Sequence, residues 1–339
     1  MATYKLQRYL LMTLDPVHIG TGGYRLGRVD NSIVREPGTR IPKIPGSAIH
    51  GAIRSYAAQL YETSEAAGQS QDKVEEPDKN PVCYTFGYIK KTKKENGEEE
   101  TRAYSGVVNI FDAHLLLFPV YSMAGPVWVS TLERLKDAGF SVKNGNTGKA
   151  SDPEYGKAYV TWERKEPLNL GWLMVEIAGQ VTMSPPESES WQNEKCWGTV
   201  ANCIVMVNEA LFSHIVNSNL EVRTSVSINP ETGAAEEGAL FTYEAIPRAT
   251  FLTMDVVLDD YREAFPNEKC GQGKTAKDNP LPGGMWKGPL DVVKAGLEMI
   301  KWLGVGGMGT RGFGRMDILS EPREETLENT VGQSEEVSA

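Results

Sequence analysis

The chain opens with apolar and polar residues alternating at the spacing of a β-strand. Residues 4–14 place their apolar side chains on one face, which predicts a strand with one buried side. The apolar face of this strand consists of Leu6, Leu10, Met12 and Leu14. Apolar residues then recur at helical spacing over residues 47–61 and again over residues 290–303, so two amphipathic helices are expected.

Between these helices the pattern indicates further strands. Residues 106–121 form an apolar run that predicts a buried strand, and residues 172–182 predict another. Residues 221–244 are rich in β-forming residues on both sides of an N-P-E-T-G turn, which predicts a hairpin. The glycine-dense residues 304–315 follow the second helix and lead into a short strand at 316–319.

Strands that alternate with helices in this order predict an α+β fold with a ferredoxin-like or RRM-like core and long insertions. We expect one such domain over residues 1–320 and a disordered acidic tail at 321–339. Three segments interrupt or project from the domain: a polar insertion at 62–105, a hairpin at 221–245 and a glycine-rich loop at 304–315. This loop does not predict a dinucleotide site, since that motif needs a strand before it and a helix after it.

The net charge of −10 argues at first against a nucleic-acid partner, because RNA-binding domains carry a basic surface. The excess of acidic residues is confined to two polar, non-periodic segments. Residues 321–339 carry a net charge of −5 and residues 62–100 one of −4, which leaves −1 for the rest of the chain. Charge therefore excludes neither RNA nor protein as a partner.

Membrane and metal-scaffold classes are not supported. No apolar run approaches the ~20 residues that a membrane span needs, and the first ten residues lack the features of a signal peptide. We expect a cytoplasmic protein without membrane contact. The four cysteines lack the spacing of zinc ligands.

The most specific signal lies in residues 15–54. These residues combine a glycine-rich turn, a lone acidic residue (Asp30) and a helix start. Ser47 is expected to cap the helix, whose first N–H groups can hold a phosphate because they have no partner inside the helix. Ser47, His50 and Arg54 are expected on the side of this helix that faces away from the core.

This stretch resembles the N-terminal signature of the RAMP superfamily, the repeat-associated proteins of CRISPR type III effector complexes. The shared pattern is H-I-G-x-G, an aspartate, I-x-R-E, P-x-I-P-G-S and G-A-x-R, found here at residues 18–22, 30, 33–36, 42–47 and 51–54. A second block is D-A-x-L-L-x-F-P-V at residues 112–120 and G-P-x-W-V at residues 125–129. It is more similar to the type III-B (Cmr) backbone subunit than to its type III-A (Csm) counterpart.

The resemblance implies a backbone subunit that binds guide (CRISPR) RNA, contacts copies of itself and other effector subunits, and cleaves single-stranded target RNA at regular intervals. Asp30 occupies the position of the aspartate that cuts target RNA in the family. It would act as a general base or as the ligand of a divalent metal ion, Mg²⁺ or Mn²⁺. His18, Tyr243 and Glu244 are secondary catalytic candidates.

The resemblance also implies RNA contacts at three places. At the start of the helix these are Lys43, Ser47, His50 and Arg54. In the glycine-rich loop, backbone N–H groups are expected against phosphates while arginines supply charge; the residues concerned are Gly306, Gly307, Arg311, Gly312 and Arg315. The hairpin is expected to act as a thumb, with Ile228 as the wedge between bases.

Other interpretations stay open on the residues alone. A Csm-type backbone subunit would have the same chemistry in a different complex. If Asp30 only stabilises a turn, the protein is a non-catalytic guide-RNA scaffold. A guide-processing endonuclease that uses His18 or His50 is a third interpretation, and it predicts cleavage of repeat RNA by the isolated subunit.

Overall fold

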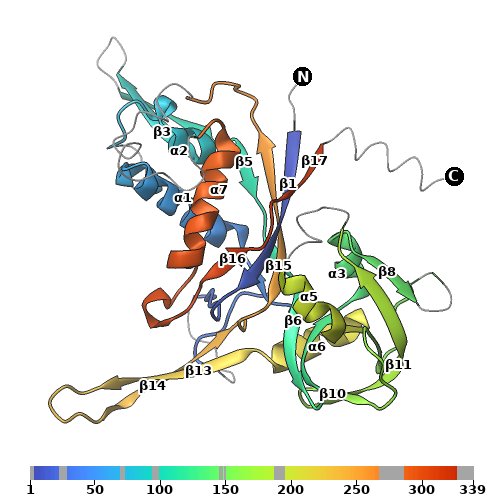
Figure 1. Cartoon of the computed structure of the whole chain (residues 1–339). Helices are drawn as coiled ribbons and strands as arrows, with labels where there is room; N and C mark the ends of the chain where they lie inside the picture. Colours follow the sequence, from blue (N-terminus) through green and yellow to red (C-terminus); the bar gives the residue numbers. More distant parts are fainter. Residues whose placement is uncertain are drawn as a thin grey trace.

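The core of the molecule is a four-stranded antiparallel sheet with two helices on one face (Figure 1). A computed structural model describes residues 4–22, 29–68, 73–93, 99–144, 148, 150–186, 195–266 and 286–326. In chain order, the core elements are β1 (Tyr4–Thr13), α1 (Gly46–Leu60), β6 (Ala113–Ser122), β15 (Phe251–Asp259), α7 (Pro289–Leu303) and β16 (Met316–Ile318). Their order across the sheet is β6-β15-β1-β16, and each neighbouring pair is antiparallel. This is the ferredoxin-like arrangement, so the predicted fold class is confirmed.

Both faces of the core sheet are buried. Tyr9 and Leu11 of β1 belong to the large apolar core that includes α1 and α7, whereas Leu10 belongs to a second apolar cluster. The two helices pack closely because Gly296 of α7 has no side chain: a Cβ there would lie 2.5 Å from Cγ2 of Ile53 in α1. β1 is therefore a central strand, not the one-sided strand that its alternation predicted.

The sheet continues past β6 into a second lobe (Figure 1). The strands that follow are β7 (Gly125–Ser130), β12 (Ile204–Val207), β9 (Lys157–Val160), β11 (Leu173–Ser184) and β10 (Leu168–Leu170), with β8 (Ser141–Asn144) also paired to β11. The helices of this lobe are α3 (Leu132–Asp137), α5 (Lys195–Val200) and α6 (Glu209–Ser218), with the 3-10 turn η4 (Ala201–Cys203). Sequence analysis placed a single strand here, at 172–182, and β11 confirms it.

The predicted hairpin is confirmed and stands away from the body of the molecule (Figure 1). It consists of β13 (Glu221–Ile228) and β14 (Ala235–Ala245), which pair with each other in a separate two-stranded sheet. The Asn229 side chain forms the turn, because its Oδ1 accepts the N–H groups of Glu231 at 2.9 Å and Thr232 at 3.3 Å.

Three predictions of local structure need correction. The run 106–121 forms two strands, β5 (Val108–Ile110) and β6, because Phe111 and Asp112 between them are not in a strand. The insertion expected to be a polar loop contains ordered elements: η1 (Ser64–Ala67), η3 (Pro77–Lys79), α2 (Pro81–Phe86), β3 (Gly87–Lys93) and β4 (Glu99–Ser105). All six residues of α2 are buried. The tail begins with a strand, β17 (Arg323–Thr326), paired to β1, and residues 327–339 lie outside the described part.

The start of α1 is also different from the prediction. Its N-cap residue is Pro45, and Ser47 lies inside the first turn without a capping hydrogen bond. The capping group comes from the distant Asp112, whose Oδ1 accepts the N–H of Gly46 at 2.7 Å. No helix in the described part of the chain is long and apolar enough to cross a membrane.

Candidate functional site

Three chain segments meet at the base of the hairpin. They are the start of the N-terminal glycine-rich turn (residues 17–20), the residues after position 29, and the end of β14. Short backbone bridges join them, linking Val17 to Ile246, Gly20 to Ile33 and Asn31 to Tyr243. The predicted catalytic residues Asp30, His18, Tyr243 and Glu244 all lie in these segments, so the structure brings together residues that are more than 200 positions apart.

Asp30 is exposed and is held by one residue, Thr242 of β14. Its Oδ2 accepts hydrogen bonds from the backbone N–H and from the hydroxyl of Thr242, both at 2.8 Å. The Asp30 N–H donates in turn to the Thr242 hydroxyl at 3.0 Å. The backbone N–H of Thr242, followed by its hydroxyl, lowers the pKa of the Asp30 carboxyl below its ordinary value. Asp30 is therefore an anion with a fixed orientation, and its Oδ1 has no hydrogen-bond partner among the described residues.

Sequence analysis missed Thr242. Nothing in its immediate surroundings distinguishes it from the other β-forming residues of the hairpin. Thr242 and Asp30 are 212 positions apart in the chain, and they are brought into contact only because β14 is hydrogen-bonded to the segment around Asn31.

His18 lies under the glycine-rich loop and is 7% exposed. Its Nδ1 is 2.7 Å from the carbonyl oxygen of Glu244, so in the neutral ring Nδ1 carries the proton and Nε2 is the free acceptor. The ring packs edge-on against Tyr243, with 5.8 Å between centroids. His18 thus supports the loop and hairpin base, and a direct role in catalysis stays a prediction.

Glu244 has a structural role in this arrangement, and a direct role in catalysis stays a prediction. Its Oε1 lies 2.6 Å from Nη2 of Arg35, and its Oε2 accepts the N–H of Ile33 at 3.2 Å. Both carboxylate oxygens are therefore used internally. Tyr243 is also largely buried, and its hydroxyl lies 3.2 Å from Nη1 of Arg311.

The glycine-rich loop, residues 304–315 with the 3-10 turn η6 (Gly309–Arg311), packs against the segment that carries His18. Gly307 N–H donates to the His18 carbonyl at 2.9 Å, and Gly312 N–H donates to Gly309 at 3.1 Å. These two N–H groups are thus committed within the protein, which corrects the expectation that they face RNA phosphates. Gly306 has φ +85°, and a Cβ on it would lie 2.5 Å from the His18 carbonyl oxygen, so the close approach requires glycine.

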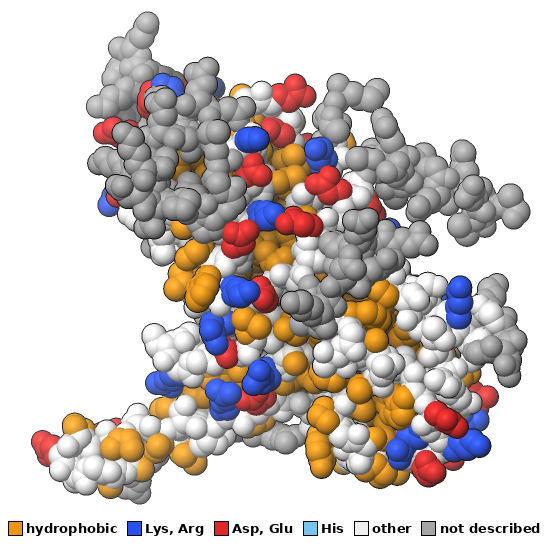
Figure 2. Space-filling view, in the orientation of Figure 1, with side chains coloured by type: hydrophobic (Ala, Val, Ile, Leu, Met, Phe, Trp, Pro, Cys, Tyr) orange, Lys and Arg blue, Asp and Glu red, His pale blue; other side chains and the backbone are white. Residues whose placement is uncertain are grey.

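Arginines gather where this loop meets the hairpin, and Figure 2 shows Lys and Arg side chains on this face among some acidic ones. The guanidinium of Arg223 in β13 lies over the ring of Phe313, 4.9 Å from its centroid. Arg311 and Arg315 are exposed at the same junction. Arg315 pairs with Asp15, which raises the pKa of its guanidinium. The face can attract a phosphate chain, although it is not uniformly basic.

The predicted RNA contacts on α1 separate into two groups. Ser47 is exposed and lines a shallow groove of about 360 Å³ between α1 and the glycine-rich loop, where Gly306 also lies. Arg54 points the other way and is 8% exposed, with its guanidinium donating to the carbonyls of Ala66 and Gly87. The prediction that Arg54 contacts RNA is therefore corrected: its side chain holds the inserted segment against α1.

His50 lies on the same inward side of α1 as Arg54. Its ring packs edge-on against Phe86, with 5.1 Å between centroids. Burial, and then the nearby Arg54 charge, lowers the pKa of His50. His50 is therefore neutral at pH 7 and is not placed to bind a phosphate as a cation.

Lys43 is held between two carboxylates, Glu36 Oε1 at 2.8 Å and Asp112 Oδ2 at 2.5 Å. The hydrogen bond to Asp112, followed by that to Glu36, raises its pKa. Asp112 also occupies the N–H of Gly46, so the start of α1 is neutralised by the protein itself. A phosphate at this helix start, as predicted, would have to displace that carboxylate.

Metal ligands are scarce in the described part of the chain. Glu36, Asp112 and His114 offer ligand atoms within 4.8 Å of one another, but the Lys43 ammonium already lies against both carboxylates. Asp30 is a single carboxylate with one unused oxygen. This fits a Mg²⁺ ion only if the other ligands are water and phosphate oxygens, which is how Mg²⁺ is often bound.

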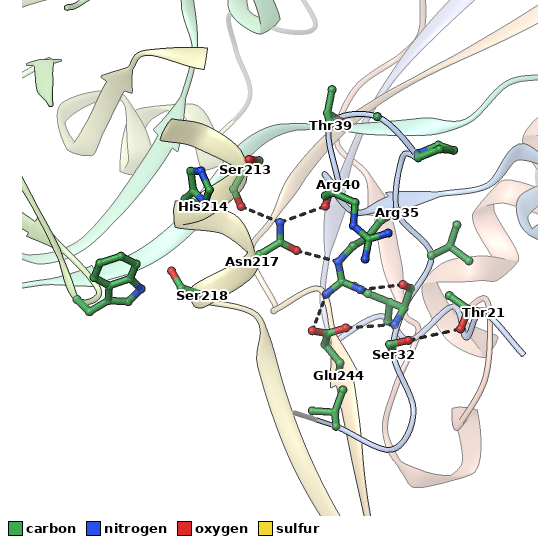
Figure 3. Close-up of a pocket in the computed structure, with 16 residues that line it drawn as sticks. Thr21, Ser32, Arg35, Thr39, Arg40, Ser213, His214, Asn217, Ser218 and Glu244 are labelled. Atoms are coloured by element: carbon green, nitrogen blue, oxygen red, sulfur yellow. Dashed lines mark hydrogen bonds and ion pairs between the residues drawn. The ribbon is translucent and has the colours of Figure 1, made fainter. Parts of the chain in front are cut away.

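A larger groove, of about 940 Å³, lies beside the Asp30 site (Figure 3). Arg35 joins its two walls: its Nε donates to Asn217 Oδ1 in α6 at 2.8 Å while its Nη2 pairs with Glu244. Asn217 in turn donates to the carbonyl of Arg40 at 3.1 Å. The groove thus has a rigid, hydrogen-bonded floor.

A ferredoxin-like core with a glycine-rich loop after its second helix, a projecting hairpin and a fixed aspartate at the hairpin base defines the class of repeat-associated CRISPR proteins. The RAMP superfamily profile matches residues 10–317. The chain belongs to the RAMP superfamily.

Individual relatives agree with this assignment. The chain is 28% identical over 255 residues to the CRISPR system Cmr endoribonuclease Cmr4 of Pyrococcus furiosus. The aligned region covers 71% of this chain and 77% of that protein. A chain in the cryo-EM structure of the type III-B Cmr-beta complex bound to cognate target RNA has the same fold, with a TM-score of 0.55 and 16% identity over 94% of this chain and 96% of that one. The apo state of that complex gives a TM-score of 0.53.

Proposed function

We propose that the protein is a backbone subunit of a type III-B CRISPR effector complex, which binds guide RNA and cleaves complementary target RNA at regular intervals. Membership of the RAMP superfamily and similarity to a Cmr endoribonuclease support this function. The observation that carries the cleavage step is the geometry of Asp30, an exposed carboxylate held at the hairpin base by both hydrogen bonds from Thr242. Further copies of the chain, other effector subunits, guide RNA and target RNA are the proposed partners.

The state of Asp30 determines its chemical role. RNA can be cut by its own 2′-hydroxyl when that oxygen, the phosphorus and the leaving oxygen are in line. The attacking 2′-oxygen loses its proton and the leaving 5′-oxygen gains one, both by exchange with water. Because its lowered pKa makes Asp30 a poor proton acceptor, Asp30 would act as an anion able to hold a divalent cation beside the scissile phosphate. The ion would neutralise charge on the phosphate as the bond breaks. Alignment of the strand supplies the remainder of the rate.

We expect the hairpin to create that alignment. Ile228, next to the turn, is 59% exposed, and Val226 and Leu240 on paired positions of the two strands are 42% and 64% exposed. An apolar strip on a projecting hairpin is costly in water, and insertion between bases would remove it from solvent. Asp30 lies at the base of the same hairpin, so the phosphate to be cut would be the one that lies where the displaced strand passes this base.

The test is target-RNA cleavage by the assembled complex with Mg²⁺, comparing wild type with Asp30→Asn and Asp30→Ala. Asparagine keeps the shape and the hydrogen bonds from Thr242 but removes the charge. We expect both variants to retain guide and target binding and to lose cleavage by at least about 100-fold. Asp152→Asn, at an exposed acidic position away from the site, is the matched control and should cut normally.

The metal is tested separately. We expect chelation to stop cleavage and Mg²⁺ or Mn²⁺ to restore it in wild type but not in Asp30→Asn. Unimpaired cutting by both Asp30 variants would refute the assignment of Asp30. Loss of cutting in wild type and variants alike, with RNA still bound, would favour the non-catalytic scaffold.

A further inference from the structure

The groove beside Asp30 has the chemistry of a nucleotide site. Val29 and Ser32, which flank Asp30 in the chain, line one end of it, and Trp172 of the second lobe lines the other. Trp172 is 72% exposed, so the face of its indole ring is accessible to a base. The volume of the groove, about 940 Å³, is in the range of pockets that enclose ligands of nucleotide size.

The polar side chains between these ends suit a ribose-phosphate chain. Figure 3 shows Ser213 of α6 on the side of the helix toward Arg40, whereas His214 and Ser218 point away from Arg40 on its other side; all three line the groove. Arg40 is exposed and has no ion-pair partner among the described residues, in contrast to Arg35, which is used in the floor. Hydroxyl, imidazole and guanidinium groups all donate to phosphate or ribose oxygens.

We propose that this groove holds the single-stranded nucleotide of the target RNA next to the cleaved phosphate, with its base stacked on Trp172 and its phosphate paired with Arg40. The inference rests on the proposed function. Unstacked bases in RNA are recognised on aromatic side chains, and arginine pairs with the backbone. Asp30 itself does not line the groove, but Val29 and Ser32 close to it in the chain do, so a strand displaced at the hairpin base would enter the groove at this end.

The proposal makes Trp172 and Arg40 positioning residues, since they act on the strand and not on the reacting atoms. Stacking of one base on an aromatic ring is worth roughly 10-fold or more in affinity. We expect Trp172→Ala to weaken target binding by about 10-fold and also to lower the cleavage rate at saturating target, because the strand beside the cleaved phosphate is then less well aligned. Trp172→Phe should restore most of the affinity. Arg40→Gln should make the slope of log affinity against log salt concentration shallower by about the contribution of one phosphate contact.

The experiment uses the assembled complex carrying Asp30→Ala, in which the target is not cut, so its outcome is independent of the cleavage assignment. Target RNAs with 2-aminopurine at successive positions around the cleavage site are bound, and fluorescence is recorded. One position should be quenched when Trp172 is present and should brighten in Trp172→Ala. Tyr155→Ala, which removes an aromatic side chain that is 70% exposed and outside the groove, should change nothing.

Three results would overturn the proposal. Fluorescence that does not respond to Trp172 at any position excludes base stacking there. Loss of another subunit from the Trp172→Ala complex, with RNA signals unchanged, identifies a protein contact instead. Full displacement of the signal by adenosine monophosphate at a concentration that leaves the target bound identifies a site for free nucleotides, not for the strand.

Discussion

Glu244 and Arg35 form an ion pair in the floor of the groove beside the Asp30 site, and Glu244→Gln tests whether this pair is structural. Their side chains are 11% and 13% exposed. Removing one partner of a buried pair costs about 3–5 kcal/mol, since the other charge is left without compensation. Arg35 keeps its hydrogen bonds to Asn217 and Ile33, and glutamine can still accept the N–H of Ile33. The cost should therefore lie at the lower end, at about 3 kcal/mol.

This loss is measured by thermal and urea unfolding of the isolated subunit. At about 2 °C per kcal/mol in a chain of this length, the Tm should fall by about 6 °C. The double variant Arg35→Met with Glu244→Met leaves no buried charge, so it should recover part of the loss and show a positive coupling in a double-mutant cycle. Cleavage by assembled complexes of Glu244→Gln should fall by less than about 10-fold.

A proton-transfer role for Glu244 would give the opposite pattern. General acid or base groups contribute about 100-fold to 10,000-fold to the rate. A cleavage rate lowered by 100-fold or more, together with an unchanged Tm and no recovery in the double variant, would refute the structural assignment.

Three further predictions concern stability, pH and the hairpin. Gly296→Ala should destabilise the fold by about 1–3 kcal/mol in urea unfolding, because its Cβ would lie 2.5 Å from Ile53 Cγ2. Gly51→Ala is the control: there is open space around its Cβ, so this substitution should stabilise the fold slightly. The pKa of His50 is lower in the folded than in the unfolded chain, so as the pH drops below about 6.5 the unfolded chain takes up this proton first and the Tm should fall. His50→Gln should make the Tm less dependent on pH. A Tm equally sensitive to pH in the variant would contradict the burial argument. Ile228→Asp should leave the Tm unchanged and abolish regular cleavage, and normal product spacing in this variant would exclude Ile228 as the wedge.

Much of the fold can be predicted from local pattern. β1, β11, the hairpin, α7 and the loop-then-strand order after it all follow from spacing and turn residues, because these signals act between residues near in sequence. The motif around Asp30 likewise stands within forty consecutive residues, which is why the candidate aspartate could be chosen without a structure. The strands of the second lobe other than β11 could not be predicted, since they are short and one of them, β12, is buried on both faces and so lacks alternation.

What the tertiary structure decided is which polar groups remain available. From sequence, Arg54 and Glu244 are charged residues in a predicted site, yet both are used inside the protein, by carbonyls of the inserted segment and by Arg35. The start of α1 looked open to phosphate until Asp112 was found on Gly46. A buried charge must be paired, but its partner is set by packing between distant segments and not by spacing. Sequence alone therefore identified the aspartate and the elements around it, while the fold determined that Thr242 holds it and that Trp172 and Arg40 line the groove beside it.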